Sequence, residues 1–313
     1  MSSIHTNAAA MTALKSLQMT NSALEATQKN ISTGFRVSDA SDNAAYWSIA
    51  TTMRSDNKAL STVNDALGLG AAKVDVAYTA MNSAIDVVDE IKAKLVAAKE
   101  PGVDKDKVQS EITALQGQLT AIAESASFSG ENWLNFTDTD GTSKEIVASF
   151  TRTSAGAVSI GTIAIDISDM KLFGDDGAGT PVDNGMLNKS YTTANGAATP
   201  VNVVYTIATL DITAANVDDT VIDGMLSNVE TTLEDMTTAA AGLGSSKSRI
   251  DMQTEFVGNL MDSIKSGIGK LVDADMTEES TRLQALQTQQ QLGIQALSMA
   301  NSGAQSLLSL FRS

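Results

Sequence analysis

Two stretches of the chain place apolar side chains at seven-residue intervals, each over about 50 residues. The first begins near Ile49 and ends at Pro101-Gly102, and the second begins near Asp218. A helix brings residues seven positions apart onto one stripe, so each stretch predicts an α-helix about 75 Å long that packs along a partner helix. The first series is Met53, Leu60, Leu67, Val74, Met81, Val88 and Leu95, with Val63, Ala77, Ala84, Ile91 and Ala98 beside it. The second is Ile222, Val229, Met236, Leu243, Ile250, Val257, Ile264 and Leu271, with Leu226, Leu233, Ala240, Met261 and Ile268 beside it.

A few residues interrupt these series, namely Asp56 and Gly70 in the first and Lys247 and Thr254 in the second. A shorter helix is predicted from about Asp104, directly after the Pro-Gly turn, so it should return antiparallel and pack as a third rod. Its predicted apolar face carries Val108, Ile112, Leu115, Leu119 and Ile122.

The middle of the chain, from 128 to about 215, has a different pattern. Short apolar runs at Ile146–Phe150, Val158–Ile167 and Val201–Ile212 predict strands separated by Gly- and Asp-rich turns. The stretch Gly174–Thr199 consists mostly of Gly, Ala, Asn, Thr and Asp and predicts a loop. We interpret this region as a small β-containing insert that faces outward.

Both ends of the chain carry weaker heptad patterns, over residues 3–32 and 275–312. Polar and small residues, such as Gln290 and Gly293, interrupt them, so these helices gain little stability alone and are expected to fold against partner helices. A Ser-, Asp- and Asn-rich passage at 33–45, the spoke loop, follows the first helix. The apolar positions expected to contact partner helices, the terminal seam, are Leu14, Leu17, Leu24, Ile31, Leu283, Leu286, Leu297, Leu307 and Phe311.

The predicted fold is therefore mainly α with a small β-containing insert: a long antiparallel helical bundle or coiled-coil rod whose terminal helices pair on assembly. Residues 1–45 and 274–313 are expected to form a terminal coiled-coil domain with the spoke loop. A helical rod domain with a β-hairpin would comprise 46–150 and 216–273, and an outer, surface-exposed β and loop domain would comprise 151–215.

Composition excludes several functions. The net charge of −16 argues against binding nucleic acid or an anionic membrane. The absence of cysteine removes disulfides, thiolate metal sites and thiol nucleophiles. Neither a cleaved signal peptide nor a transmembrane run is expected.

No constellation of acid, base, nucleophile or cofactor residues is evident, so no enzyme, cofactor or metal site is predicted. His5 is the only histidine and stands without neighbouring ligands. The Asp138–Gly141 segment resembles a calcium loop, but Phe136 and Val147 occupy positions that require ligands.

Arg36 and Arg54 lie in or near the spoke loop. Each is either a solvated surface charge or a partner of an acid such as Asp39, Asp42 or Asp56, in this or a neighbouring subunit, that fixes the loop. We therefore place Arg36, Asp42 and Arg54 as candidate spoke-loop contacts.

Several motifs resemble those of bacterial flagellins, and especially of alphaproteobacterial ones with a short outer domain. The likeness covers roughly 1–150 and 215–313. The motifs are Ile4-His5-Thr6-Asn7, Asn30-Ile31-Ser32-Thr33-Gly34-Phe35-Arg36-Val37, Asp42-Asn43-Ala44-Ala45, Ser127-Phe128-Ser129-Gly130, Ser245-Ser246-Lys247-Ser248-Arg249 and Leu308-Ser309-Leu310-Phe311-Arg312.

The resemblance implies a flagellar filament subunit that is exported by the flagellar type III apparatus and forms an extracellular homopolymer for swimming motility. Implied partners are sister flagellins, an export chaperone and a cap protein. Residues 88–99 match the region that Toll-like receptor 5 recognises in many flagellins, but Glu90 stands where a basic residue is expected, which implies weak or no recognition. The alternatives are a hook–filament junction protein or a secreted coiled-coil adhesin.

Overall fold

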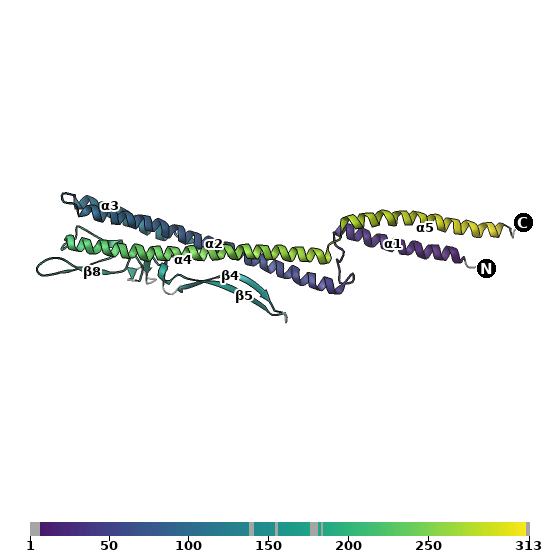
Figure 1. The fold of residues 1–313 in the computed structure, drawn as a ribbon, viewed down its shortest axis with the longest axis horizontal. Helices are drawn as coiled ribbons and strands as arrows, with labels where there is room; N and C mark the ends of the chain where they lie inside the picture. Colours follow the sequence, from purple (N-terminus) through teal and green to yellow (C-terminus); the bar gives the residue numbers. More distant parts are fainter. Residues whose placement is uncertain (1–6, 138–140, 154–155, 176–180, 183, 311–313) are drawn as a thin grey trace. The chain divides into compact units, whose positions relative to one another are not determined.

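The computed structural model describes residues 7–137, 141–153, 156–175, 181–182 and 184–310. The chain divides into two compact units, one drawn from Met1–Lys58 with Met261–Ser313 and the other formed by Ala59–Leu260. Five helices dominate the described residues (Figure 1), which confirms the mainly α fold with a small β insert. The helices are α1 (Ala8–Thr33), α2 (Ala44–Ala98), α3 (Lys105–Ser125), α4 (Asp219–Val272) and α5 (Met276–Leu310).

Within Ala59–Leu260, α2 and α4 lie side by side and run antiparallel (Figure 1), with Lys92 paired to Glu230 and Lys99 to Asp223. The predicted heptad positions form the buried seam between them, because one stripe of each helix faces the other. The buried members are Leu60, Leu67, Val74, Met81, Val88 and Leu95 on α2 and Ile222, Val229, Met236, Leu243, Ile250 and Val257 on α4.

Two of the breaks in the heptad pattern have structural explanations. Gly70 leaves room for the hairpin strand β4 (Ser143–Arg152), since a Cβ at Gly70 would lie 2.5 Å from Cγ2 of Ile146. Lys247 forms an ion pair with Asp75, so a charge on one long helix is matched by an opposite charge on the other. These positions therefore join parts of the unit that are far apart in sequence.

The buried face of α3 differs from the prediction. Leu115 and Ile122 are only half-buried, whereas Gln116 and Ala123 are buried. Gln116 is accommodated because its Nε2 donates to the carbonyl oxygens of Ile207 and Leu210, at 3.0 and 3.1 Å. The insert thus supplies acceptors that the helical pattern could not reveal.

The first half of α4 is buried over a wider face than a two-helix seam requires. Thr232 and Ala239 are buried, while Leu226 and Leu233, predicted on the seam, are half-buried. The insert covers this side, where the hydroxyls of Tyr191 and Thr232 lie 2.9 Å apart.

The β structure of the insert is arranged as small, separate sheets among the described residues. Strands β4 and β5 (Val158–Asp166) form a long antiparallel hairpin where strands were predicted at Ile146–Phe150 and Val158–Ile167, with a register shift between Val147 and Ser149. Val201–Ile212 is a strand only at β9 (Asn202–Tyr205), because a 3-10 helix at Ile207–Thr209 follows it. Gly174–Thr199 is not wholly loop, since β8 (Tyr191–Ala194) pairs with β9.

The remaining strands of the described residues are β1 (Ser127–Phe128), β2 (Glu131–Asn132), β3 (Asn135–Thr137), β6 (Phe173–Asp175) and β7 (Pro181–Val182), and a further 3-10 helix spans Ser168–Met170.

Candidate assembly interface

The terminal helices α1 and α5 pair antiparallel with each other in this chain (Figure 1). Asn7 begins α1, because its side chain accepts a hydrogen bond from the N–H of Ala10. Ala8 is the first helical residue of the described chain, and the part of the predicted helix before Asn7 lies outside the described residues. Gly34 ends α1 with φ 74°, a left-handed conformation that glycine adopts without a steric penalty. At the other end, the Asp275 carboxylate accepts from the N–H groups of Thr277 and Glu278 and caps α5.

Most described members of the terminal seam lie along the contact between the two helices. Leu17, Leu24 and Ile31 of α1 and Leu283, Leu286 and Leu297 of α5 are half-buried. Leu14, expected on the same face, is more exposed, at 47 %. Leu307 belongs to α5, and Phe311 lies outside the described residues.

The paired helices also leave large apolar side chains uncovered, including Leu14 of the predicted seam. A helix pair in water would normally present polar groups there, so these side chains form a surface suited to further helices. They are Met11, Leu14 and Met19 on α1 and Met276, Leu292, Ile294 and Met299 on α5.

The spoke loop occupies residues 34–43 and is joined to the end of α4. The backbone N–H groups of Arg36 and Val37 donate to the carbonyl oxygen of Val272, and Ala274 N–H donates to the carbonyl of Gly34. A small apolar core holds the loop against α2 and α4. Its buried members are Val37, Ala50, Ile268 and Val272, with Met53, Ile264 and Leu271 against them.

Both predicted arginines contact this region, but through partners other than carboxylates. Arg36 donates from its guanidinium to the carbonyl oxygen of Leu271 at 3.0 Å. Arg54 lies over the ring of Phe35, with its Cζ 5.0 Å from the ring centroid. The arginines therefore tie the loop to α2 and α4 through a carbonyl and a ring.

Lys29 of α1, a residue that no sequence pattern marks out, makes ion pairs with the loop. Its Nζ lies 2.7 Å from Asp39 and 3.5 Å from Asp42. Hydrogen bonding to Asp39 raises the pKa of Lys29, and the same hydrogen bond lowers the pKa of Asp39. Hydrogen bonds from the backbone N–H groups of Asp39 and Ser38 lower the pKa of Asp42, whose carboxylate thereby closes the turn.

These pKa shifts predict that the spoke loop loosens in acid. A lowered carboxyl pKa stabilises the fold above the ordinary value of 3.8, and this contribution is lost as the pH falls through the folded-state pKa. Lys29 contributes below its ordinary pKa of 10.5 and loses that contribution as the pH rises through its folded-state pKa. In the unsubstituted chain, the Ser38 and Asp39 amides should become less protected against hydrogen exchange once the pH drops below 3.8. In Asp42→Ala, the same amides should already be unprotected at neutral pH.

The control for the acid experiment is Asp262→Ala, which removes an exposed acid paired only weakly with Lys265, at 3.7 Å. Its loop amides should behave as in the unsubstituted chain. Full protection of the same amides in Asp42→Ala would show that the carboxylate does not hold the loop.

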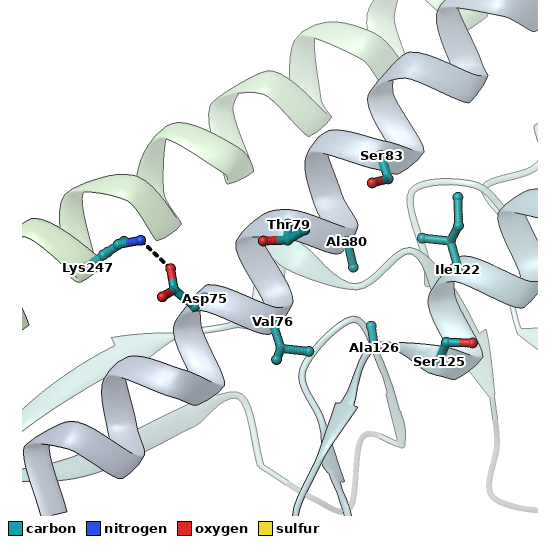
Figure 2. A pocket seen from close by; sticks show the side chains of 9 residues that line it. All are labelled: Asp75, Val76, Thr79, Ala80, Ser83, Ile122, Ser125, Ala126 and Lys247. Atoms are coloured by element: carbon teal, nitrogen blue, oxygen red, sulfur yellow. Dashed lines mark hydrogen bonds and ion pairs between the residues drawn. The ribbon is translucent and has the colours of Figure 1, made fainter.

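A groove of about 630 Å³ lies on Ala59–Leu260, bordered by α2, the end of α3 and Lys247 of α4. Figure 2 shows Lys247 and Asp75 paired at one edge, with small and aliphatic side chains beyond them. The lining residues are Asp75, Val76, Thr79, Ala80, Ser83, Ile122, Ser125, Ala126 and Lys247.

No group of three or more His, Asp or Glu side chains suited to a metal ion occurs among the described residues. His5 and Asp138–Asp140, considered above, lie outside them. In the described part of the chain, no helix is long and apolar enough to cross a membrane.

The long antiparallel helices, together with terminal helices that pair and keep an apolar outer side, define a class of coiled-coil subunits built for assembly. Residues 4–139 match the family model of the bacterial flagellin N-terminal helical region, and residues 226–311 match that of the bacterial flagellin C-terminal helical region. The chain therefore belongs to the bacterial flagellin family, whose members are structural subunits of the extracellular flagellar filament and assemble with one another.

Relatives match over the full length of both chains. Identity is 52 % to Flagellin C and 46 % to Flagellin A of Rhizobium meliloti (strain 1021), and 47 % to a flagellin of Brucella melitensis biotype 1. The crystal structure of Bacillus cereus flagellin is a more distant match, with a TM-score of 0.40 at 16 % identity over 63 % of this chain and 88 % of that one.

Proposed function

We propose that this filament subunit polymerises through α1 and α5, with the terminal seam packing the pair and its uncovered side receiving neighbouring copies. One observation carries the proposal: the two helices contact each other along their length, yet Met11, Leu292 and Met299 stay exposed. When further helices cover the apolar surface of a helix pair, that surface is removed from water, and this stabilises the assembly. Because α1 and α5 are interrupted by polar and small residues, the assembly supplies stability that each helix lacks alone.

The domain division follows from this role. We assign 1–45 and 274–313 to the terminal coiled-coil domain, 46–150 and 216–273 to the helical rod domain, and 151–215 to the outer domain. The contacts of Arg36, Asp42 and Arg54 support a spoke loop that fixes the passage from the terminal helices to the rod. A catalytic activity is not part of the proposed function.

Further partners belong to the export and growth of the filament. Type III export, an export chaperone and a cap protein are proposed from membership of the family. Weak or no recognition by Toll-like receptor 5 is proposed because Glu90 presents a carboxylate on the exposed side of α2, where it lies 3.8 Å from Lys94. A strong response of the receptor to purified monomer would contradict this point.

Material sheared from the cell surface can test whether this chain is a filament subunit. Electron microscopy should show filaments, and mass spectrometry should find this chain, alone or with sister flagellins, as their main component. A chain present only in trace amount at the base of filaments would instead be a junction protein, and a chain found only as a monomer would not be a filament subunit.

A further inference from the structure

Polar side chains occupy heptad positions in the α1–α5 contact where a simple apolar seam would place leucines. Glu279 precedes Leu286 by seven residues and is 6 % exposed, and Gln290 lies seven residues from both Leu283 and Leu297. Burying such a group lowers the stability of the fold unless the group forms a hydrogen bond. The hydrogen-bond partners of Glu279 and Gln290 therefore favour one alignment of α1 on α5.

Each of these groups has a specific partner on α1. Nε2 of Gln290 donates to Oδ1 of Asn21 at 2.8 Å, and Nδ2 of Asn30 donates to Oε1 of Glu279 at 3.2 Å. The two pairs lie nine residues apart along α1 and eleven along α5. Glu279 Oε1 also lies 3.7 Å from the Arg282 guanidinium of its own helix, and Oε2 has no hydrogen-bond partner among the described residues. Asn30 is therefore the residue of α1 that donates to this buried carboxylate.

A steric contact marks the same alignment. Gly293 lies opposite Leu17, and a Cβ built on Gly293 would lie 3.2 Å from Cδ1 of Leu17. That distance is tighter than ordinary van der Waals contact, so the leucine fits against α5 here because the opposing residue has no side chain.

Sliding one helix by seven residues would keep many apolar contacts but break all three features. Asn21 would then face Leu283 or Leu297 in place of Gln290, and Leu17 would face Leu286 or Ala300 in place of Gly293. Buried amides would lose their partners, which apolar side chains cannot replace. Apolar matching alone therefore leaves the register open, and the polar pairs discriminate among the alternatives.

We propose that Asn21–Gln290 and Asn30–Glu279, with Leu17 against Gly293, specify a single register of α1 on α5 of the same chain. These residues determine which surface the pair offers to neighbouring copies. The proposal rests on the proposed function only in taking the filament as the state in which the pair is measured.

Cysteine pairs test the register cleanly, because the chain contains no cysteine of its own. The Cβ of Leu17 lies 3.9 Å from the Cβ position of Gly293, within the range that a disulfide spans. In filaments oxidised after assembly, L17C/G293C should form an intrachain disulfide. The pairs shifted by one heptad, L17C/L286C and L17C/A300C, should form at least about tenfold less.

Replacing the amide pair by leucines should release the register. In the N21L/Q290L background, the shifted pairs should gain about tenfold in yield relative to the native pair. The matched control is Q18L/Q289L, which makes the same chemical change at two exposed positions of the same helices and should leave the yields unchanged.

A cysteine-free exchange gives a second measurement. Q290N shortens one amide and should raise the critical concentration for assembly about fivefold, because the hydrogen bond to Asn21 is lost. The exchange N21Q/Q290N restores the combined length of the two side chains and therefore their hydrogen bond. It should return the critical concentration to within about twofold of that of the unsubstituted chain.

Equal yields from the native and shifted pairs, disulfides mainly between chains, or no rescue by N21Q/Q290N would overturn the register proposal while filaments still form. Failure of the unsubstituted chain to form filaments would contradict the proposed function instead.

Discussion

Removal of residues 275–313 is expected to abolish filament assembly and to leave Ala59–Leu260 folded. The deletion takes away α5, and with it the partner of α1, whereas the seam between α2 and α4 within Ala59–Leu260 stays complete. An isolated helix of 26 residues with many polar interruptions is marginal in water, so α1 should unfold as well. The loss of helical signal in far-ultraviolet circular dichroism should therefore exceed the 35 residues of α5 that are deleted.

Sedimentation and electron microscopy under conditions that polymerise the intact chain provide the comparison. The truncated chain should remain monomeric at every concentration that yields filaments from the intact chain, and should keep a cooperative thermal transition. Normal filaments from the truncated chain would rule out α5 as an assembly element.

Leu67→Ala is expected to lower the free energy of unfolding of the monomer by about 2–5 kcal/mol, because it leaves a cavity in the α2–α4 seam. Leu67 is 0 % exposed and is among the largest fully buried side chains. The change is measured by urea denaturation followed by circular dichroism, with the slope compared between variants to check that the denatured state is unchanged.

Leu69→Ala is the matched control, since it makes the same substitution two residues away on the same helix. Leu69 is 51 % exposed, so its truncation should alter the free energy of unfolding by no more than about 0.5 kcal/mol. Equal effects of the two substitutions would contradict the assignment of the heptad stripe to the core.

The long helices could be predicted from the sequence because a seven-residue apolar repeat has one physical interpretation over such lengths. The heptad stripe from Leu60 to Leu95 is buried as expected. The interruptions were not predictable individually, since Gly70 is explained by Ile146 and Lys247 by Asp75, each supplied by another element. The insert was predicted least well, because strands as short as β8 carry too few residues for a periodic signal.

In the terminal helices, the apolar positions could be found from the sequence and their polar partners could not. Gln290 breaks a heptad series, which indicates that it needs a partner, but nothing local reveals that Asn21, 269 residues away, is that partner. Lys29 could not be identified from the sequence, because an exposed lysine in a helix is ordinary until the turn through Asp42 brings two carboxylates to it. Leu14 shows the converse, since its spacing matches the seam but its side chain is exposed.

Cryo-electron microscopy of filaments assembled from the intact chain tests most directly whether α1 and α5 build the polymer. We expect each subunit to contribute one α1–α5 pair, with Leu17 against Gly293 and with Met11, Leu292 and Met299 covered by neighbouring subunits. Filaments in which these side chains remain in solvent, or in which α1 and α5 make no contact between subunits, would contradict the account.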